Sequence, residues 1–322
     1  MGHLGRRALH GVFLLVGVSV LSFVFFELAP GDFYAGVELN PQISPETLAT
    51  LRARHGMDRS LPQRYLGWVE SVLRGEFGYS LAYNGPVGPL LWPRARNTLV
   101  LTGLATLLTW GIAVPLGVWW AARSGRWGDR LCAVGSSVLL TVPDLVLALG
   151  LLLVAVRSGA IPTGGMVSPG FEELGAWDKV RDLGAHLLLP VTALVLGSLP
   201  VIVRHVRASM VEVLRSPFVR AARGHGIPAR RLLFRHALPA AANPLISLFG
   251  FSVASLLSMS LLVEVVMSWP GLGPLMLEAI LARDLYLILG PVMASTAFLV
   301  AGNLLADVLL LAADPRIRER QG

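Results

Sequence analysis

Long apolar runs alternate with shorter polar segments along most of this chain. Six runs are long enough to cross the roughly 30 Å hydrocarbon core of a bilayer as helices, which takes about 20 residues. They lie at 8–28, 98–122, 131–156, 186–206, 245–267 and 288–313. The first run is too long for the apolar part of a cleaved signal peptide. We therefore expect residues 1–322 to form a single all-α domain, a polytopic membrane protein with six transmembrane helices.

The longest polar segment, 29–97, contains two predicted amphipathic helices. The first has Ser44 as N-cap, Pro45 at the first helical position and Gly56 at its end. The second follows a Leu-Pro pair and gathers apolar side chains on one face. These side chains are Tyr65, Trp68, Val69, Val72 and Leu73. Both helices should lie outside the membrane, where they cap the bundle, contact an external partner, or do both.

Prolines occur inside three of the predicted spans, at positions 115, 143, 190 and 200. Each removes a backbone hydrogen bond, and neighbouring helices must satisfy the freed carbonyl. Such prolines suit helices that line a cavity, and they also occur as packing features.

Three acidic residues fall in or near the predicted spans: Asp144, Glu264 and Asp307. Ionisable residues in a membrane are costly, and they usually pair with one another or line a pathway. We favour hydrogen bonding between helices for Glu264 and Asp307. For Asp144, both structural pairing and a position on a solute pathway remain open. No metal-ligand signature or nucleophile–base pair is present, so neither a metal site nor an enzyme active site is expected.

Composition supports membrane insertion. The chain is 54% hydrophobic with a mean hydropathy of +0.64, which is too apolar for a soluble domain of this size. The net charge is +7, but basic residues cluster beside apolar runs, which argues against nucleic acid as a partner. The single cysteine, Cys132, allows no disulfide within the chain. The one lysine, Lys179, lacks the context of a phosphate-binding loop, so any ATP used must be bound by another chain.

The arginines are distributed unequally between the two sides of the predicted bundle. The side that holds both termini carries sixteen, at positions 6, 7, 123, 126, 130, 204, 207, 215, 220, 223, 230, 231, 235, 316, 318 and 320. The acids on this side are Asp129, Glu212, Asp314 and Glu319, whereas the opposite loops are near neutral. Basic loops remain in the cytoplasm. Both termini and segment 215–240 are therefore predicted to be cytoplasmic.

Segment 215–240 is too polar for the bilayer, and its pattern predicts two short helices. Ser216 is a candidate N-cap, and Pro217 fits the first helical position, where a missing N–H costs nothing. Gly224 and Gly226 are stop positions that tolerate a positive φ. A later proline would open the second helix. An ordinary basic loop that only maintains topology would show the same features.

The same segment resembles the EAA loop of permease subunits in bacterial ABC importers. The positions shared with that motif are Ala221, Ala222, Gly226, Leu238 and Pro239. Arg220 stands where the general motif has Glu, and His236 takes a hydrophobic position. The run FVRAARGHG is similar to the FVRTARAKG version found in the peptide-permease branch.

Further motifs, in the order of the dipeptide/oligopeptide permease family, cover nearly the whole chain. They are LAPGD at 28–32, HGMDRSLPQRYLGWVESVLRGEFGYSL at 55–81, RNTLVLT at 96–102, VEVVMSWPGLG at 263–273, ARDLYLILGPV at 282–292 and NLLADVLLLAADPRIR at 303–318. The long first outer loop is similar to that of the first of the family's two permease subunits. The chain departs from the family pattern at Met267, at Leu310 or Leu311, and at Pro217.

This resemblance implies the fold of a type I ABC importer permease in a bacterial inner membrane. It implies a second permease subunit, two cytoplasmic ATPase subunits that bind ATP and Mg²⁺, and an external solute-binding protein. This chain would itself need no cofactor. The solute would be a peptide or similar molecule, with dipeptides, oligopeptides, nickel complexes, opines and sugars all left open. The alternative is a self-sufficient secondary transporter, although no clear internal repeat is present.

In the family, the EAA loop is the coupling helix that docks into a groove of the ATPase. The resemblance gives Phe218 the role of an anchor in that groove, and the alternative for Phe218 is burial in its own bundle. Residues expected to pack beside the anchor are Val219, Ala221 and Ala222. Basic residues expected to pair with acids of the groove are Arg220, Arg223 and Arg230. Such exposed pairs would contribute less than the aromatic anchor, and Gly226 would end the helix.

Overall fold

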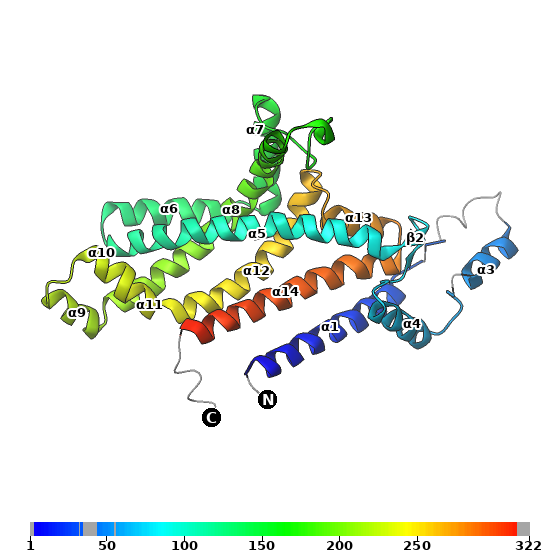
Figure 1. Ribbon diagram of the computed structural model, residues 1–322, viewed down its shortest axis with the longest axis horizontal. Helices are drawn as coiled ribbons and strands as arrows, with labels where there is room; N and C mark the ends of the chain where they lie inside the picture. The colour runs from blue at the N-terminus through cyan, green and yellow to red at the C-terminus, as the bar shows by residue number, and fades with distance from the viewer. Residues whose placement is uncertain (1–2, 32, 35–43, 55, 314–322) are drawn as a thin grey trace. The chain divides into compact units, whose positions relative to one another are not determined.

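The computed structural model describes residues 3–31, 33–34, 44–54 and 56–313. Within them, five helices are long and apolar enough to cross a membrane. They are α1 (His3–Leu28), α5 (Val87–Ala122), α8 (Ala176–Leu214), α12 (Ala242–Val266) and α14 (Leu285–Ala313). Two shorter helices, α6 (Trp127–Thr141) and α7 (Asp144–Ser158), together supply a sixth candidate span. The expected all-α membrane fold is thus present (Figure 1).

Several helices extend past the apolar runs that predict them. Helix α5 begins at Val87, ahead of the predicted start at residue 98, and α8 covers more than the predicted 186–206. A helix can continue into polar flanks because its backbone hydrogen bonds are internal. Asp32 and the C-terminal segment 314–322, with its predicted cytoplasmic arginines, lie outside the described residues.

The third predicted span, 131–156, is not one continuous helix, because the chain bends by 96° between α6 and α7. Pro143 has no N–H and its ring clashes with the preceding turn, so it serves as the N-cap of α7. Val142 is extended, with φ −82° and ψ 118°, which is the conformation favoured before proline. The break places Asp144 in the first turn of α7.

The chain folds as two compact units, and the first consists mainly of residues 99–269 and 299–322. Here α8 packs against α6, α7 and α12, and the loop before α8 contains a 3₁₀ turn, η1 (Phe171–Glu173). Buried side chains of α8 contribute to two apolar clusters. A Cβ added at Gly117 of α5 would lie 2.6 Å from Val206 of α8. The missing side chain therefore allows these two helices to approach closely.

The second unit consists of residues 5–98 and 270–298. Its shorter elements are α3 (Pro45–Arg54), α4 (Leu61–Leu73), β1 (Tyr79–Ser80), β2 (Gly85–Pro86) and α13 (Leu272–Leu281). Strands β1 and β2 pair in antiparallel orientation. Phe23 of α1, Trp68 of α4 and Leu289 of α14 form its apolar core. The buried Asp284 carboxylate accepts the Ser80 hydroxyl at 2.7 Å and so ties the hairpin to the start of α14.

Both amphipathic helices predicted in 29–97 are present. The Ser44 hydroxyl caps α3 by accepting the Thr47 N–H at 3.2 Å, and Gly56 has a φ of +67°. The side chains of α4 that pack in the core of this unit are Leu61, Tyr65, Trp68, Val69 and Val72. Leu73, predicted on the same face, is instead exposed, because it is the last residue of α4 and lies beyond this apolar stripe. The packing of α4 agrees with a capping role, and contact with an external partner stays a prediction.

Candidate functional site

Residues 215–240 form short helices, as the sequence predicts. Helix α9 (Pro217–Gly224) begins with Ser216 as N-cap and a proline at its first position. Pro228 is the N-cap of the next helix. That helix runs through α10 (Ala229–Arg231), the π-helix η2 (Leu232–Ala237) and α11 (Leu238–Ala240). Each of these prolines stands where a backbone N–H would have no helical partner, so the predicted starts of both helices are confirmed.

Gly226 ends α9 in the left-handed conformation, with a φ of +75°. Its N–H donates to the Arg223 carbonyl at 3.0 Å, and the Ile227 N–H donates to the Ala222 carbonyl at 3.4 Å. These two bonds form a Schellman motif, which satisfies the last carbonyls of a helix. Gly224, the other predicted stop, remains helical. The positive φ predicted at Gly226 is therefore confirmed, at a position that strongly favours glycine.

Helix α9 has one buried face and one open face. The Val219 side chain is 0% exposed, and α9 contacts α8 and η2. The neighbouring Phe218 is 48% exposed. Val219 therefore packs α9 against its own protein. This burial does not agree with the prediction that Val219 packs beside the anchor in a partner's groove. Burial of Phe218 in its own bundle is not observed, and an anchoring role for it stays a prediction.

The other residues predicted to contact a partner lie on or beside the open face. Arg220, Ala221, Arg223, Gly226 and Arg230 are exposed, and Ala222 is partly buried. The three arginines form no ion pair within the part of the chain that the structure describes. Their charges are therefore available to acidic groups of a partner, and this role also stays a prediction.

The three acids of the predicted spans lie in different environments. Glu264 of α12 and Asp307 of α14 are buried, and each has a polar interaction within the chain. Hydrogen bonding between helices, which we favour for both residues, stays a prediction. Asp144 is exposed, and its carboxylate makes no hydrogen bond or ion pair with any residue that the structure describes. Of the two interpretations left open for Asp144, pairing within its own chain is not observed.

Asp144 lines a cavity of about 120 Å³ formed by residues of α7, α8 and α12. Gly197 of α8 lies beside it, and a Cβ there would clash with the Met259 side chain and lie 3.2 Å from an Asp144 carboxylate oxygen. The hydroxyl-bearing residues Ser198, Ser252 and Ser255 line the same cavity. Asp144 is the first residue of α7, where the helix dipole favours a negative charge. The cavity therefore offers a carboxylate and hydroxyl groups to a polar or cationic solute group.

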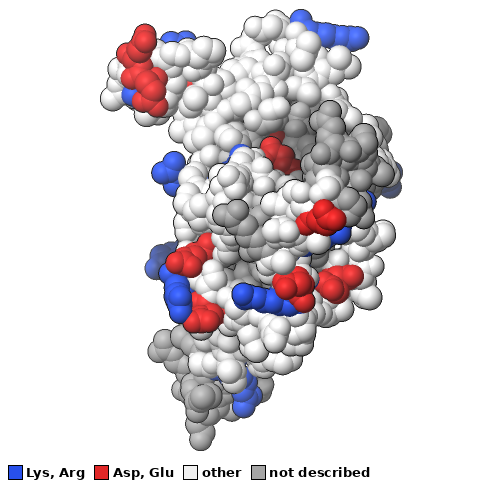
Figure 2. Space-filling model, turned by 90° about the vertical axis from the view of Figure 1, so that its right-hand side faces the viewer, with Lys and Arg blue, Asp and Glu red and all other residues white. Residues whose placement is uncertain are grey.

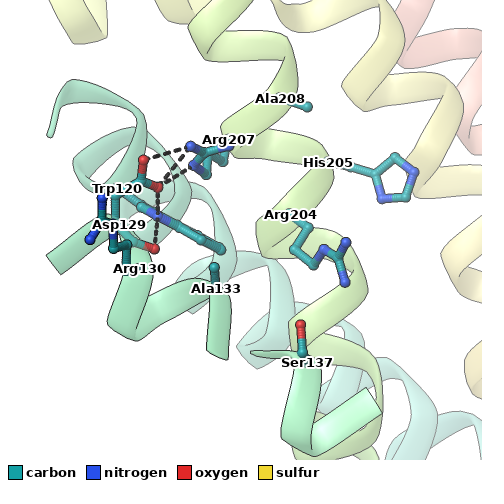
Figure 3. A pocket seen from close by; sticks show the side chains of 9 residues that line it. All are labelled: Trp120, Asp129, Arg130, Ala133, Ser137, Arg204, His205, Arg207 and Ala208. Carbon is teal, nitrogen blue, oxygen red and sulfur yellow. Dashed lines mark hydrogen bonds and ion pairs between the residues drawn. The ribbon is translucent and has the colours of Figure 1, made fainter. Parts of the chain in front are cut away.

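A larger cavity of about 480 Å³ is formed by residues of α5, α6 and α8 (Figure 3). It is lined by Trp120, Asp129, Arg130, Ala133, Ser137, Arg204, His205, Arg207 and Ala208. Arg207 Nε and Nη2 donate to the two Asp129 carboxylate oxygens, each at 2.9 Å. From the sequence, Arg130, Arg204 and Arg207 predict only which side of the membrane this end of the protein faces. No local pattern joins Asp129 to Arg207, because they are 78 positions apart.

These features define a class of protein: a multi-pass helical membrane protein with an exposed, basic, glycine-terminated helix between α8 and α12. The chain belongs to the family of binding-protein-dependent transport system inner membrane components, whose family model matches residues 113–319. A model for the N-terminal part of such membrane components matches residues 1–92.

Relatives are similar to this chain over almost its whole length. The oligopeptide transport system permease protein AppB of Bacillus subtilis (strain 168) is 34% identical over 314 residues, covering 97% of this chain and 98% of AppB. The dipeptide transport system permease protein DppB of Escherichia coli (strain K12) is 33% identical, covering 95% of each chain. The oligopeptide transport system permease protein OppB of Mycobacterium tuberculosis is 32% identical, covering 98% of each chain.

Solved structures support the fold. A chain of the MetNI methionine ABC transporter, in an inward-facing conformation, superimposes with a TM-score of 0.57 at 17% sequence identity. The match covers 70% of this chain and 96% of that chain. At this identity the likeness concerns the fold alone, which is that of a type I ABC importer permease.

Proposed function

We propose that this chain is a permease subunit of an ATP-driven ABC importer that takes up peptides or peptide-like solutes. The observation that carries the proposal is its 32–34% identity to oligopeptide and dipeptide permeases along nearly the full length of both chains. Together with a second permease subunit, it would form the pathway for solute delivered by an external binding protein. No observation favours the alternative of a self-sufficient secondary transporter.

Two cytoplasmic ATPase subunits would bind ATP and Mg²⁺ and supply the energy. The chain's one lysine, Lys179, has no phosphate-loop context. We expect the purified chain to hydrolyse no ATP, and uptake of labelled peptide by reconstituted vesicles to require the ATPases, the binding protein and ATP. Uptake by the chain alone, driven by an ion gradient, would instead establish a secondary transporter.

The protein is further proposed to lie in a bacterial inner membrane, with both termini and α9 on the cytoplasmic side. The concentration of arginines in and around α9 supports this orientation through the positive-inside rule. In the view of Figure 2, basic and acidic side chains are intermixed rather than separated by sign. A mixed face of this kind is compatible with the external side.

Single cysteines should be labelled from opposite sides of the membrane. In a chain carrying Cys132→Ala, His225→Cys beside α9 should react with a membrane-impermeant maleimide only in inverted vesicles. Ser60→Cys at the start of α4 should react only in intact cells. Both positions are exposed, so the side of the membrane decides the access of the reagent. Labelling of His225→Cys in intact cells would reverse the proposed topology.

We propose that Asp144 faces the solute pathway. At the centre of a span, a carboxylate facing lipid costs roughly 3 kcal/mol, so an exposed acid is expected to face water or a partner. In the Cys132→Ala background, Asp144→Cys should react with a water-soluble thiosulfonate, at a rate that changes during transport. Val146→Cys, exposed on the same helix, is the control and should stay unreactive, because the reactive thiolate forms only in water. An unreactive Asp144→Cys would contradict the pathway position.

A further inference from the structure

We propose that the cavity of Figure 3 binds the phosphate head group of an anionic phospholipid. Its lining contains three arginines, Arg130, Arg204 and Arg207, and one acid, Asp129. Arg207 engages Asp129, which leaves Arg130 and Arg204 with no acidic partner among the residues that the structure describes. Two unpaired guanidinium groups beside a cavity of about 480 Å³ suit a phosphate, because its oxygens accept charge-assisted hydrogen bonds from arginine.

The Asp129–Arg207 pair holds one wall of the cavity in place. Asp129 also accepts a hydrogen bond from the Trp120 indole, and the Arg207 guanidinium lies 5.0 Å from the Trp120 ring centroid. These contacts connect α5, α6 and α8, the three helices that supply the lining of the cavity. In Figure 3, the Arg204 side chain extends from α8 toward Ser137 of α6. A cation and a hydroxyl group from two helices therefore border the same space.

An apolar stripe on α6 favours a lipid over a free phosphate ion. The stripe consists of Leu131, Val134 and Val138, which are 61%, 62% and 58% exposed. Each follows directly after a residue that lines the cavity, namely Arg130, Ala133 and Ser137. The stripe thus runs alongside the cavity, where it can receive the acyl chains of a lipid whose head group is bound. A free phosphate ion has no apolar part that could contact the stripe.

Tryptophans indicate that the cavity lies at the boundary between membrane and water. Trp119 near the end of α5 and Trp127 at the start of α6 are both exposed. The Arg123 guanidinium lies 4.3 Å from the Trp119 ring centroid. Tryptophan is enriched at membrane interfaces, and basic pockets between helices at this level bind phospholipid head groups. The inference concerns a lipid, and it does not depend on which solute is transported.

The test measures phospholipid retained by the assembled transporter after extraction from vesicles of phosphatidylglycerol and phosphatidylethanolamine. Native mass spectrometry compares the parent with a variant that carries both Arg130→Gln and Arg204→Gln. Retention of phosphatidylglycerol should fall about tenfold in the double variant. The control is Arg157→Gln, which removes an exposed arginine from the last turn of α7 and should leave retention unchanged.

A charge-preserving variant and a competing anion distinguish a bound lipid from a bound phosphate ion. Arg204→Lys preserves the charge and should retain more phosphatidylglycerol than Arg204→Gln. Excess inorganic phosphate should not displace the lipid, and displacement would assign the cavity to free phosphate instead. Equal retention by the parent and the double variant would overturn the proposal. Equal retention is also the result expected if a partner subunit covers the cavity. If the double variant does not assemble, each single variant provides the test, with an expected loss of about threefold.

Discussion

Replacing Phe218 with alanine is expected to abolish the stimulation of ATP hydrolysis by substrate in the reconstituted transporter. Phe218 is 48% exposed, whereas Val219 attaches α9 to its own protein, so the truncation removes contact area from the partner's side. A central aromatic anchor at an interface commonly contributes about 2 kcal/mol or more, which corresponds to roughly a 30-fold loss of affinity. The measurements are the ATPase rate with and without loaded binding protein, and the amount of ATPase that co-purifies with the permease.

Two variants test whether this effect belongs to the anchor. Phe13→Ala removes an equally large exposed ring from α1 and should leave coupling intact. Arg230→Ala should weaken coupling less than Phe218→Ala, because an exposed ion pair contributes only about 0.2–1 kcal/mol. The membrane level of each variant is compared with that of the parent. If Phe218→Ala couples normally while Arg230→Ala abolishes transport, the anchor assignment is wrong and docking is electrostatic.

Gly226→Val should also uncouple ATP hydrolysis from transport, although residue 226 offers no side chain to a partner. Its φ of +75° is strained for a β-branched residue, at a cost of roughly 1–2 kcal/mol. Relief of that strain would break the two hydrogen bonds that end α9, to the Ala222 and Arg223 carbonyls. The last turn of α9 would then lose its position relative to Phe218. Substrate-stimulated ATPase activity and peptide uptake are the quantities to measure.

If backbone strain at residue 226 causes the uncoupling, substitutions at residue 226 and close to it should differ in how much coupling they remove. Gly226→Asn should retain most coupling, since asparagine tolerates the left-handed conformation better than other residues with a side chain. Gly224→Val places the same side chain two positions earlier, in helical backbone with no other atom within 4 Å of its Cβ. It should therefore perturb coupling only mildly. An equal loss of coupling in Gly224→Val and Gly226→Val would show that side-chain volume at this end of α9 causes the loss, and not the positive φ of residue 226.

Features that depend on neighbouring residues in the chain were accessible from the sequence. The lengths of the apolar runs predict the spans, because a helix satisfies its own backbone inside a bilayer. Ser216, Pro217 and Gly226 mark the limits of α9, because caps and positive φ are properties of a few consecutive residues. The resemblance to the EAA loop was also sufficient to select Phe218 as a candidate anchor, although not to determine its exposure.

The response of each helix to its prolines was decided by tertiary packing. Pro190 and Pro200 lie inside α8, which stays continuous, whereas Pro143 separates α6 from α7 by a bend of 96°. Both prolines of α8 are buried among packed side chains, and those contacts can hold the two sides of a proline in line. Helix α6 has no buried residue among those described, so little opposes the break. The sequence shows a proline in each case and does not distinguish these outcomes.

The sequence by itself determined that this is a multi-pass helical membrane protein of the importer permease type, with a basic, capped helix before α12. Only the tertiary structure decided that Val219 is buried while Phe218 is open, and that Asp144 lines a cavity. It also brought Asp129 to Arg207 across 78 positions and left Arg204 beside them without an acidic partner in the described chain. The physical reason is that caps and spans arise from local backbone geometry, whereas burial and cavities arise from which helix faces meet.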